Sequence, residues 1–308
     1  MKKRLKEELI KLAENPVQWD CNLAPYTSFG IGGPAEALVQ VASPLELGRL
    51  LTFFADHFLN WRFIGRGSNL LVSDSGFAGV ILLFGKPLSQ IELLEESGGG
   101  NVRVRVGAGC SLAKLLSWCT DKRFSGLEFT AGIPGSLGGA IVMNAGAWGG
   151  EIADIVDSLE VISLHSGVER LEHDELDFRY RVWANQGDGK NKRLVLSADI
   201  CLKPGKKIEI YEKCREYLTQ RKAKQPKIEK NAGSFFKNPT GDSAGRLIEA
   251  SGLKGTTFGG AMVSPVHANF LVNTGNATAS DVCRLMDIVT IQVKKDSGVR
   301  LLPEVHFL

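Results

Sequence analysis

The stretch GIPGSLGGAIVMNAGAWGG, residues 132–150, decides how the rest of this sequence is interpreted. It combines many glycines with small and apolar residues and contains no charged side chain. Glycine has no Cβ, so it adopts left-handed and tightly turned conformations and lets a ligand approach the backbone N–H groups. A diphosphate is the ligand class that suits such a loop. The structural alternative is a glycine-rich turn packed beneath a sheet.

Two further glycine-rich turns come earlier in the chain. GIGGPA, residues 30–35, loosely matches the dinucleotide fingerprint G-x-G-x-x-[GA], but a strand is expected after it instead of a helix, which excludes a Rossmann site. GRGSNL, residues 65–70, lies between two apolar segments and offers backbone amides with hydroxyl and carboxamide groups. Three such loops without a Walker motif indicate a long ligand held by backbone amides, and FAD meets that description.

The loop residues expected to contact FAD share an accessible backbone or a neighbouring polar side chain. They are Gly32, Gly33, Pro34, Gly65, Arg66, Gly67, Ser68, Asn69, Leu70, Gly132, Ile133, Pro134, Gly135, Ser136, Gly138, Gly139 and Ala140. No histidine that could tether the flavin ring occurs in these loops, so noncovalent binding is expected.

Composition limits the class of protein. A chain of 308 residues, 44% of them hydrophobic, can bury the cores of two or three domains. A net charge of +3 argues against a strongly basic nucleic-acid binder. No apolar run reaches the length of a membrane span and the N-terminus lacks a signal-peptide core, so a cytoplasmic protein without membrane insertion is expected. The scattered cysteines form no metal motif or disulfide framework.

Periodicity and capping signals predict a mixed α+β chain. A Ser-Pro pair at residues 43–44 opens one helix, and a capping box at residues 278–281 opens another that ends at Gly298. The expected helices cover residues 1–15, 43–57, 111–122, 208–221, 243–251 and 279–295. The expected strands cover residues 37–41, 61–64, 80–84, 102–106, 155–164, 193–202, 260–264, 269–273 and 299–307. The helix at 208–221 is expected to bury Ile208, Tyr211, Cys214 and Leu218.

These elements suggest three consecutive parts. Residues 1–28 form an N-terminal helix and lead-in, and residues 29–204 form an FAD-binding domain of two subdomains with a break near 86–100. Residues 204–207, Pro-Gly-Lys-Lys, act as a linker. Residues 208–308 form a smaller α+β domain.

Several short motifs together resemble one enzyme family. In chain order they are G-x-GG-x-A at 30–35, GRGSN at 65–69, GIPGSLGGAIVMNAGA at 132–147, YR at 180–181, NAGSFFKNP at 231–239, SAGRLIE at 243–249, HANFLVN at 267–273 and LLPEV at 301–305. The sequence resembles the UDP-N-acetylenolpyruvoylglucosamine reductase (MurB) family of peptidoglycan synthesis from about residue 25 onward.

The resemblance implies a fold and a reaction. The FAD-binding part would have the vanillyl-alcohol-oxidase or PCMH-type fold, and the C-terminal domain would bind substrate. NADPH would reduce FAD, and the hydride would then reach the vinyl carbon of UDP-N-acetylglucosamine enolpyruvate to give UDP-N-acetylmuramate. Such a reaction needs a proton donor for the other carbon and groups that stabilise the developing enolate.

Family motifs assign these roles to three residues. Ser234 in NAGSFFKNP would donate the proton, and Arg181 and Glu304 would be its partners at the enolate. Taken alone, a serine in this context is more often a turn residue. Glu304 in an apolar strand would need a partner if buried. Arg179 competes with Arg181, and only the Tyr-Arg order of the family selects between them.

Cations are expected to bind the substrate diphosphate and carboxylate. The resemblance and the charge pattern select Tyr180, Arg221, Lys224, Asn238 and Arg246 as substrate-binding residues. For His267 a structural role is favoured. No protein partner is implied.

The sequence departs from the family pattern at residues 182–183, where Val-Trp follows Tyr-Arg in place of a polar pair. The chain also resembles the shorter branch of the family, which lacks a tyrosine-bearing insertion over the substrate.

Two other functions remain open at this stage. An oxidase of the same flavin-binding fold would act on an alcohol or sugar, and a non-catalytic flavin or nucleotide sensor would keep the three glycine loops. The sensor would have no reason to retain Ser234, Arg181 and Glu304 together.

Overall fold

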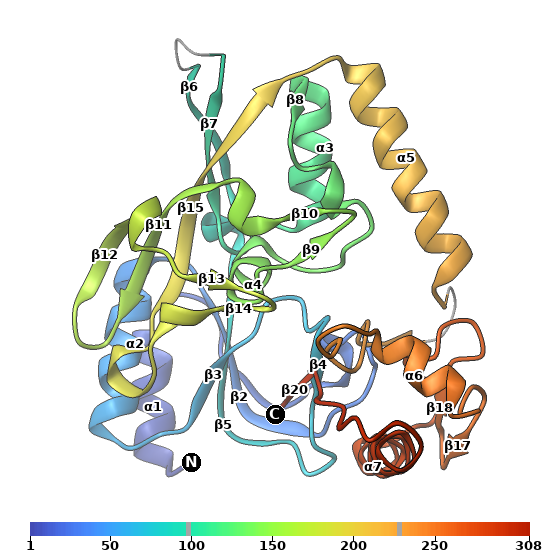
Figure 1. Ribbon diagram of the computed structural model, residues 1–308. Helices are drawn as coiled ribbons and strands as arrows, with labels where there is room; N and C mark the ends of the chain where they lie inside the picture. The colour runs from blue at the N-terminus through green and yellow to red at the C-terminus, as the bar shows by residue number, and fades with distance from the viewer. Residues whose placement is uncertain (97–99, 227–229) are drawn as a thin grey trace. The chain divides into compact units, whose positions relative to one another are not determined.

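The computed structural model describes residues 1–96, 100–226 and 230–308 (Figure 1). The chain forms two compact units, and each is described by itself. Unit 1 contains Met1–Trp19, Ala37–Gly65 and Gly79–Thr219. Unit 2 contains Asp20–Glu36, Arg66–Ala78 and Gln220–Leu308. The units are therefore interleaved along the chain and do not coincide with the consecutive ranges 29–204 and 208–308 expected from the sequence.

Several of the α-helices begin where a side chain bonds the backbone N–H groups of the first turn. Ser43 and Ser111 each accept a hydrogen bond as an N-cap. Thr278 and Asp281 form the predicted capping box, and Gly298 ends that helix in a left-handed conformation, so both predictions are confirmed. The α-helices of the described residues are α1 (Lys3–Leu12), α2 (Pro44–Asp56), α3 (Leu112–Lys122), α4 (Leu137–Val142), α5 (Lys207–Lys224), α6 (Ala244–Ala250) and α7 (Ala279–Ser297).

Short 3-10 helices join several of the larger elements. They are η1 (Ala24–Tyr26), η2 (Lys86–Ser89), η3 (Glu128–Thr130), η4 (Ile152–Asp154), η5 (His173–Glu175), η6 (Ala184–Gln186) and η7 (Gly189–Asn191). The strands are β1 (Gln18–Asn22), β2 (Pro34–Val41), β3 (Trp61–Phe63), β4 (Leu70–Leu71), β5 (Phe77–Phe84), β6 (Ile91–Glu96), β7 (Val102–Gly107), β8 (Phe124–Ser125), β9 (Gly146–Ala147), β10 (Gly150–Glu151), β11 (Val156–Ser163), β12 (Gly167–Glu172), β13 (Phe178–Arg179), β14 (Val182–Trp183), β15 (Leu194–Pro204), β16 (Lys230–Asn231), β17 (Thr257–Phe258), β18 (Ala261–Val263), β19 (Leu271–Asn273) and β20 (His306–Phe307).

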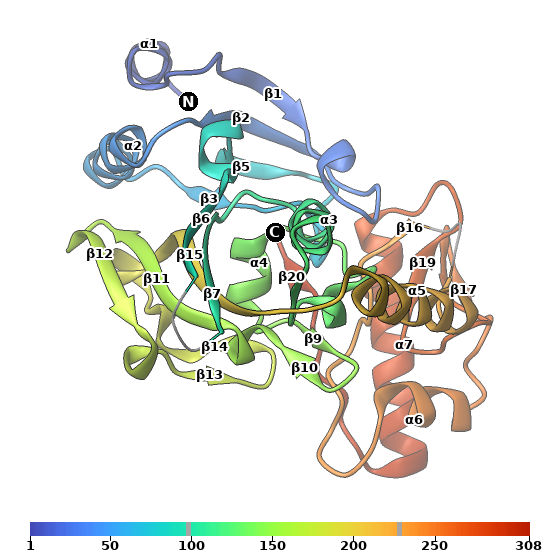
Figure 2. The ribbon, with the colours of Figure 1, turned by 90° about the horizontal axis from the view of Figure 1, so that it is seen from above.

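A six-stranded sheet forms the centre of unit 1. Its main path runs β12-β11-β15-β7-β6 with antiparallel neighbours, and β8 pairs with β15. Strand β7 alternates as predicted, because Val102, Val104 and Val106 are buried while Arg103 and Arg105 are partly exposed. Residues of α3 and α4 pack into the core that these valines join. The helices α1 and α2 lie side by side over a second core of the same unit (Figure 2).

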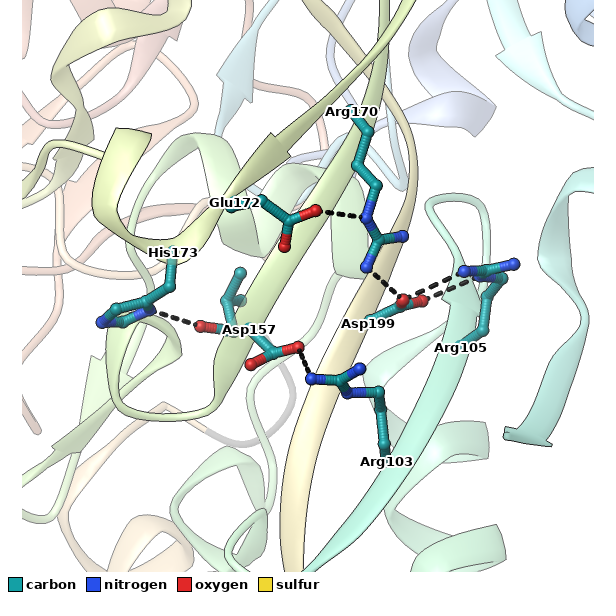
Figure 3. Close-up of polar contacts among 8 residues, drawn as sticks. Arg103, Arg105, Asp157, Arg170, Glu172, His173 and Asp199 are labelled. Carbon is teal, nitrogen blue, oxygen red and sulfur yellow. Dashed lines mark hydrogen bonds and ion pairs between the residues drawn. The ribbon is translucent and has the colours of Figure 1, made fainter. Parts of the chain in front are cut away.

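An ion-pair network lies on the strands of this sheet (Figure 3). Asp199 is only 3% exposed and accepts two hydrogen bonds from Arg105, at 2.8 and 3.0 Å, and one from Arg170 at 2.9 Å. Glu172 also bonds Arg170, at 2.7 Å. Burial acts to raise the pKa of Asp199, but the hydrogen bonds from the two arginines outweigh it, and the pKa lies below its usual value. The buried carboxylate therefore stabilises the sheet in its ionised form.

We expect Asp199→Asn to lower the free energy of unfolding by about 2 kcal/mol at neutral pH, because it leaves Arg105 and Arg170 without their shared charge. This loss of unfolding free energy is smaller than for a fully buried ion pair, because the arginine side chains are 38% exposed and can be solvated by water. Because the folded-state pKa is lowered, this stabilisation is present above the ordinary carboxyl pKa and is lost as pH falls through the folded value.

Urea unfolding between pH 7 and pH 3 measures this effect. The difference in unfolding free energy between wild type and Asp199→Asn should become smaller as the pH is lowered. Glu172→Gln is the matched control, because Glu172 bonds the same Arg170 but is 56% exposed, and it should change stability by less than about 1 kcal/mol. A difference in unfolding free energy that is the same at all pH values would contradict the role of the Asp199 charge.

Unit 2 has a core to which distant parts of the chain contribute. Phe29, Ile31 and Leu71 pack with residues of α6 and α7, which lie side by side (Figure 2). A sheet in the order β16-β19-β18-β17 and the parallel pair β20-β4 complete the unit. The residues around the first two glycine loops thus share a core with the C-terminal part of the chain, which explains why the compact units are interleaved.

Helix α5 differs from the prediction in the face that it buries. Ile210 and Cys214 are the buried residues, whereas Ile208, Tyr211 and Leu218 are 60%, 55% and 39% exposed. The prediction for these three residues was wrong because apolar side chains occur on more than one face of this highly charged helix, so spacing alone does not select the inner one.

Two other sequence expectations concern chain breaks. The predicted break near 86–100 contains η2 and β6, and its residues 97–99 lie outside the described residues. The predicted linker at 204–207 contains the end of β15 and the first residue of α5. Within the described ranges, none of the helices is both long and apolar enough to cross a membrane.

Candidate active site

In unit 2, the loop that contains residues 30–34 packs tightly against the loop that follows Gly65. The Gly33 N–H donates to the Ser73 carbonyl at 2.8 Å, and the Ser28 N–H donates to the Gly67 carbonyl at 3.1 Å. Gly67 has a φ of +61°, and a Cβ there would overlap with the carbonyl oxygen of Tyr26. Glycine at position 67 is therefore required for the approach of the two loops.

The loop opening the stretch 132–150 packs in unit 1. Ser136 caps α4 by accepting from the Gly139 N–H at 3.4 Å, and a Cβ on Gly65 would lie 2.5 Å from the Ser136 hydroxyl oxygen. The Gly138 N–H donates to the Ala108 carbonyl at 2.9 Å. The loop after β3 and the loop before α4 thus come together at Gly65 and Ser136.

The packing refines the expected role of these glycines. Neighbouring protein atoms fill the space beside Gly33, Gly65, Gly67 and Gly138, so at these positions the missing side chain brings two segments together. Beside Gly139, the nearest atom to a built Cβ is the Ser136 hydroxyl at 3.4 Å, an ordinary contact. The loops pack against one another two by two, and a side chain at Gly139 would meet no close neighbour. This arrangement suits a cofactor that is bound by backbone groups.

Asp74, in the turn after β4, fastens that turn to a helix, a feature that the sequence did not indicate. Its two carboxylate oxygens accept from the N–H groups of Ala279 at 2.7 Å and Ser280 at 2.9 Å, in the first turn of α7. A carboxylate is favourable at this helix end because the N–H groups there lack helical partners. No local sequence signal links residue 74 to residue 279.

Unit 2 brings together the segments that carry Ser234 and Glu304. The Glu304 N–H donates to the Phe235 carbonyl at 2.8 Å, and the Lys237 N–H donates to the Leu302 carbonyl at 2.9 Å. Both Ser234 and Glu304 are half-buried. Two of the predicted catalytic residues therefore lie on adjacent, backbone-bonded segments.

The segment with Glu304 is not the strand predicted for residues 299–307. Only β20 is a strand there, and Pro303 forms an isolated bridge with Phe236. Asn69 bonds the backbone of this segment in place of a neighbouring strand. Its side chain donates to the Glu304 carbonyl at 3.1 Å, and its backbone carbonyl accepts from the His306 N–H at 3.0 Å. The second glycine loop is thereby bonded directly to the Glu304 segment.

Tyr180 and Arg181 form the tip of a two-residue hairpin in unit 1. Strands β13 and β14 pair around them, with Arg179 opposite Val182. Trp183 is 1% exposed and anchors the hairpin in the core. The Arg181 guanidinium lies 5.1 Å from the centre of the Tyr180 ring. Trp183, the second residue of the Val-Trp departure from the family pattern, thus supplies a buried anchor two positions after the arginine.

Arg179, the competitor of Arg181, has a different environment. It forms a two-pronged ion pair with Asp177, at 2.6 and 3.0 Å, and its side chain is 69% exposed. The hydrogen bonds that it donates to Asp177 raise its pKa. The ion pair with Asp177 engages the guanidinium of Arg179, whereas the guanidinium of Arg181 lies beside the Tyr180 ring.

Several predicted substrate residues have partners within unit 2. Arg246 pairs with Asp242, whose pKa this hydrogen bond lowers to about 2. The Asn238 side chain accepts from the Ala244 N–H at 3.0 Å at the start of α6. Arg221 lies in the last turn of α5, where burial lowers its pKa. Lys224, also in that last turn, is exposed.

His267 has the surroundings of a structural residue. Its Nδ1 accepts from the Asn269 N–H at 3.2 Å, and its ring packs edge-on against Phe270 at 5.0 Å. Burial lowers its pKa, which favours the neutral ring that such an acceptor requires.

Metal and disulfide chemistry has no support in the described residues. They contain no cluster of His, Cys, Asp or Glu suited to a metal ion, and no disulfide joins their cysteines. Cys110 and Cys119 are fully buried, and burial raises the pKa of the Cys119 thiol to about 12. A thiol with this pKa is unreactive near neutral pH.

Comparisons with known proteins show which family the chain resembles. A model of the FAD binding domain matches residues 35–171, and a model of the UDP-N-acetylenolpyruvoylglucosamine reductase C-terminal domain matches residues 225–308. UDP-N-acetylenolpyruvoylglucosamine reductase of Syntrophus aciditrophicus is 40% identical over 304 residues, covering 99% of this chain and 96% of that protein. The reductase of Carboxydothermus hydrogenoformans is 41% identical over 307 residues, covering 100% of this chain and 99% of that protein.

A solved structure extends the likeness to three dimensions. The crystal structure of UDP-N-acetylenolpyruvylglucosamine reductase (MurB) from Thermus caldophilus superposes with a TM-score of 0.78 at 36% identity, covering 95% of this chain and 98% of that one. The predicted α+β architecture, with an FAD-binding fold followed by a smaller C-terminal domain, is therefore confirmed.

Proposed function

The chain belongs to the UDP-N-acetylenolpyruvoylglucosamine reductase family, and from this membership we propose how its residues carry out the reaction. It is a flavin-dependent oxidoreductase that reduces UDP-N-acetylglucosamine enolpyruvate to UDP-N-acetylmuramate, a precursor of peptidoglycan. NADPH is the reductant.

The observation that carries the proposed mechanism is the hydrogen bond between the Glu304 N–H and the Phe235 carbonyl, at 2.8 Å. It holds the segments of Ser234 and Glu304 together, and Asn69 of the second glycine loop bonds the same Glu304 backbone at 3.1 Å. A proton donor, a carboxyl group and a cofactor loop are thus joined within one unit. Such an arrangement supports a protonation step beside a bound flavin.

When bound, FAD supplies the hydride that it has received from NADPH. Ser234 donates a proton to the carbon next to the substrate carboxylate as negative charge develops there. Arg181, through its positive charge, and Glu304 are the partners of Ser234 at the developing enolate. The buried backbone of Phe235 and Phe236 fixes the position of Ser234 for this transfer.

The glycine loops hold the cofactor noncovalently. Contacts come from residues 32–34, 65–70, 132–136 and 138–140, which belong to the FAD-binding part assigned to residues 29–204. Substrate binds the part assigned to 208–308, through Arg221, Lys224, Asn238 and Arg246, and through Tyr180 of the hairpin. Because Asp242 pairs with Arg246, a substrate phosphate would compete with that carboxylate for the guanidinium.

The site of action is the cytoplasm, where NADPH and nucleotide-linked sugars are available. The same reaction connects the protein to cell shape, growth and division through the supply of peptidoglycan.

We expect the purified protein to be yellow, with FAD released by acid precipitation. Under anaerobic conditions NADPH should bleach the flavin absorbance, and UDP-N-acetylglucosamine enolpyruvate should restore it within one turnover. Absorbance spectroscopy in a sealed cuvette measures both steps, with UDP-N-acetylglucosamine as the control that lacks the vinyl group. A flavin that is reoxidised only by oxygen would favour an alcohol or sugar oxidase, and a protein that binds flavin but is not reduced would favour a sensor.

A further inference from the structure

Asn269 is a buried asparagine, 3% exposed, in the turn that precedes β19. Its side chain makes two hydrogen bonds to one residue. The Oδ1 atom accepts from the Phe236 N–H at 2.9 Å, and the Nδ2 group donates to the Phe236 carbonyl at 2.8 Å. The backbone carbonyl of Asn269 also accepts from the Phe235 N–H at 2.7 Å. One residue therefore bonds three backbone groups directly after Ser234.

The remaining backbone groups of this segment are bonded on the other side. The Phe235 carbonyl accepts from the Glu304 N–H at 2.8 Å, and Phe236 forms a bridge with Pro303. Phe235 and Phe236 are also buried as side chains, at 0% and 1% exposure. The backbone after Ser234 is thus clamped between Asn269 and the segment of Glu304.

Before Ser234, the Gly233 N–H donates to the Asn231 side chain at 2.9 Å, and Ala232 is buried. Gly233 has a φ of +78°, and apart from its two chain neighbours no atom of the described residues lies within 4 Å of a Cβ built there. A glycine in this conformation rotates more freely than the residues that follow it. Ser234 therefore lies between a left-handed glycine and the clamped backbone of Phe235 and Phe236.

We propose that Asn269 is a positioning residue for the reduction of the enolpyruvyl substrate, because its side chain fixes the backbone from which Ser234 donates its proton. The inference rests on the proposed role of Ser234. Proton transfer depends steeply on distance, and a displacement of about 1 Å can slow a reaction about 100-fold. Flavin reduction by NADPH needs no proton from Ser234, so the two half-reactions should respond differently to loss of the clamp.

Asn273 offers a matched control. It is also a buried asparagine, 6% exposed, four positions further along the chain. Its side chain bonds the Phe29 carbonyl and the N–H groups of Gly275 and Ala277, at 2.8 to 3.1 Å. Replacing it removes a comparable set of buried hydrogen bonds in the same unit, and the bonds removed go to Phe29, Gly275 and Ala277 instead of Phe236.

The test compares flavin-loaded Asn269→Ala and Asn273→Ala by anaerobic stopped-flow absorbance, well below their unfolding temperatures. For Asn269→Ala, reoxidation by UDP-N-acetylglucosamine enolpyruvate should slow about 10- to 100-fold, with a larger solvent deuterium isotope effect. Its reduction by NADPH should stay within about twofold of wild type. Asn273→Ala should keep both half-reactions within about twofold.

Asn269→Asp provides a second variant if the alanine variant does not fold. A protonated carboxyl group has the shape and the bonding pattern of the amide, since its O–H can donate to the Phe236 carbonyl. Its reoxidation rate, relative to wild type, should therefore recover as pH is lowered.

Each outcome has a defined meaning. Equal slowing of both half-reactions in Asn269→Ala, or the same behaviour in both alanine variants, would overturn the positioning role and leave the proposed function intact. An Asn269→Asp variant with no pH dependence relative to wild type would do the same. If Ser234→Ala does not slow reoxidation, the proposed proton donor is itself wrong.

Discussion

Ser234→Ala is expected to slow reoxidation of the reduced flavin by UDP-N-acetylglucosamine enolpyruvate about 10²- to 10⁴-fold, while reduction by NADPH remains near the wild-type rate. The range is that of a positioned general acid, whose loss leaves water as the proton source. The segment of Ser234 keeps its bonds to Asn269 and Glu304 in this variant, because they involve the backbone of Phe235 and Phe236. Anaerobic stopped-flow absorbance of each half-reaction measures the difference.

Thr240→Ala is a suitable control for this prediction. Thr240 is an exposed hydroxyl residue of the same unit, six positions further along the chain, and its loss should change neither half-reaction. Equal loss of both half-reactions in Ser234→Ala would refute a specific role in proton transfer. It would point instead to a disturbed binding site.

Gly67→Ala should abolish retention of FAD during purification and lower the free energy of unfolding by well over 2 kcal/mol. Two effects add at this position. A left-handed φ costs a non-glycine residue about 1–2 kcal/mol, and the new Cβ would overlap with the Tyr26 carbonyl, which forces apart two loops expected to hold the cofactor. Flavin content per protein and urea unfolding of the apoprotein measure the two consequences separately.

Gly167→Ala separates backbone strain from crowding. Gly167 has nearly the same φ, +68° against +61°, but no atom of the described residues lies within 4 Å of a Cβ built there. This variant should lose only about 1–2 kcal/mol and should keep its flavin. If both variants lose the same stability and keep the same flavin content, the close approach of the two loops does not matter for cofactor binding.

The elements that could be predicted from the sequence are those that depend on residues close together in the chain. Helix starts at Ser43, Ser111 and Thr278 depend on a side chain and an N–H group three residues away, so a short window contains all that is needed. The alternation of Val and Arg in β7 likewise depends only on the two-residue period of a strand. The candidate catalytic residues came from motifs, whose resemblance to a known family the comparisons support.

Other features depend on contacts between distant parts of the chain. The backbone around Glu304 is bonded by Asn69 and Phe235, which lie far away in sequence, so a strand pattern at 299–307 was misleading. The inner face of α5 is chosen by what it packs against, and its apolar residues occur on several faces. The clamp at Asn269 and the tether at Asp74 have no local signature at all.

The interleaved core of unit 2 has a consequence for synthesis on the ribosome. Phe29, Ile31 and Leu71 are made early, yet the helices that cover them and β20, which pairs with β4, are made last. Contacts of such long sequence separation form slowly, so these apolar side chains stay uncovered while most of the chain is translated. The nascent protein should therefore depend on chaperones that shield its N-terminal segments until residues 301–307 have emerged.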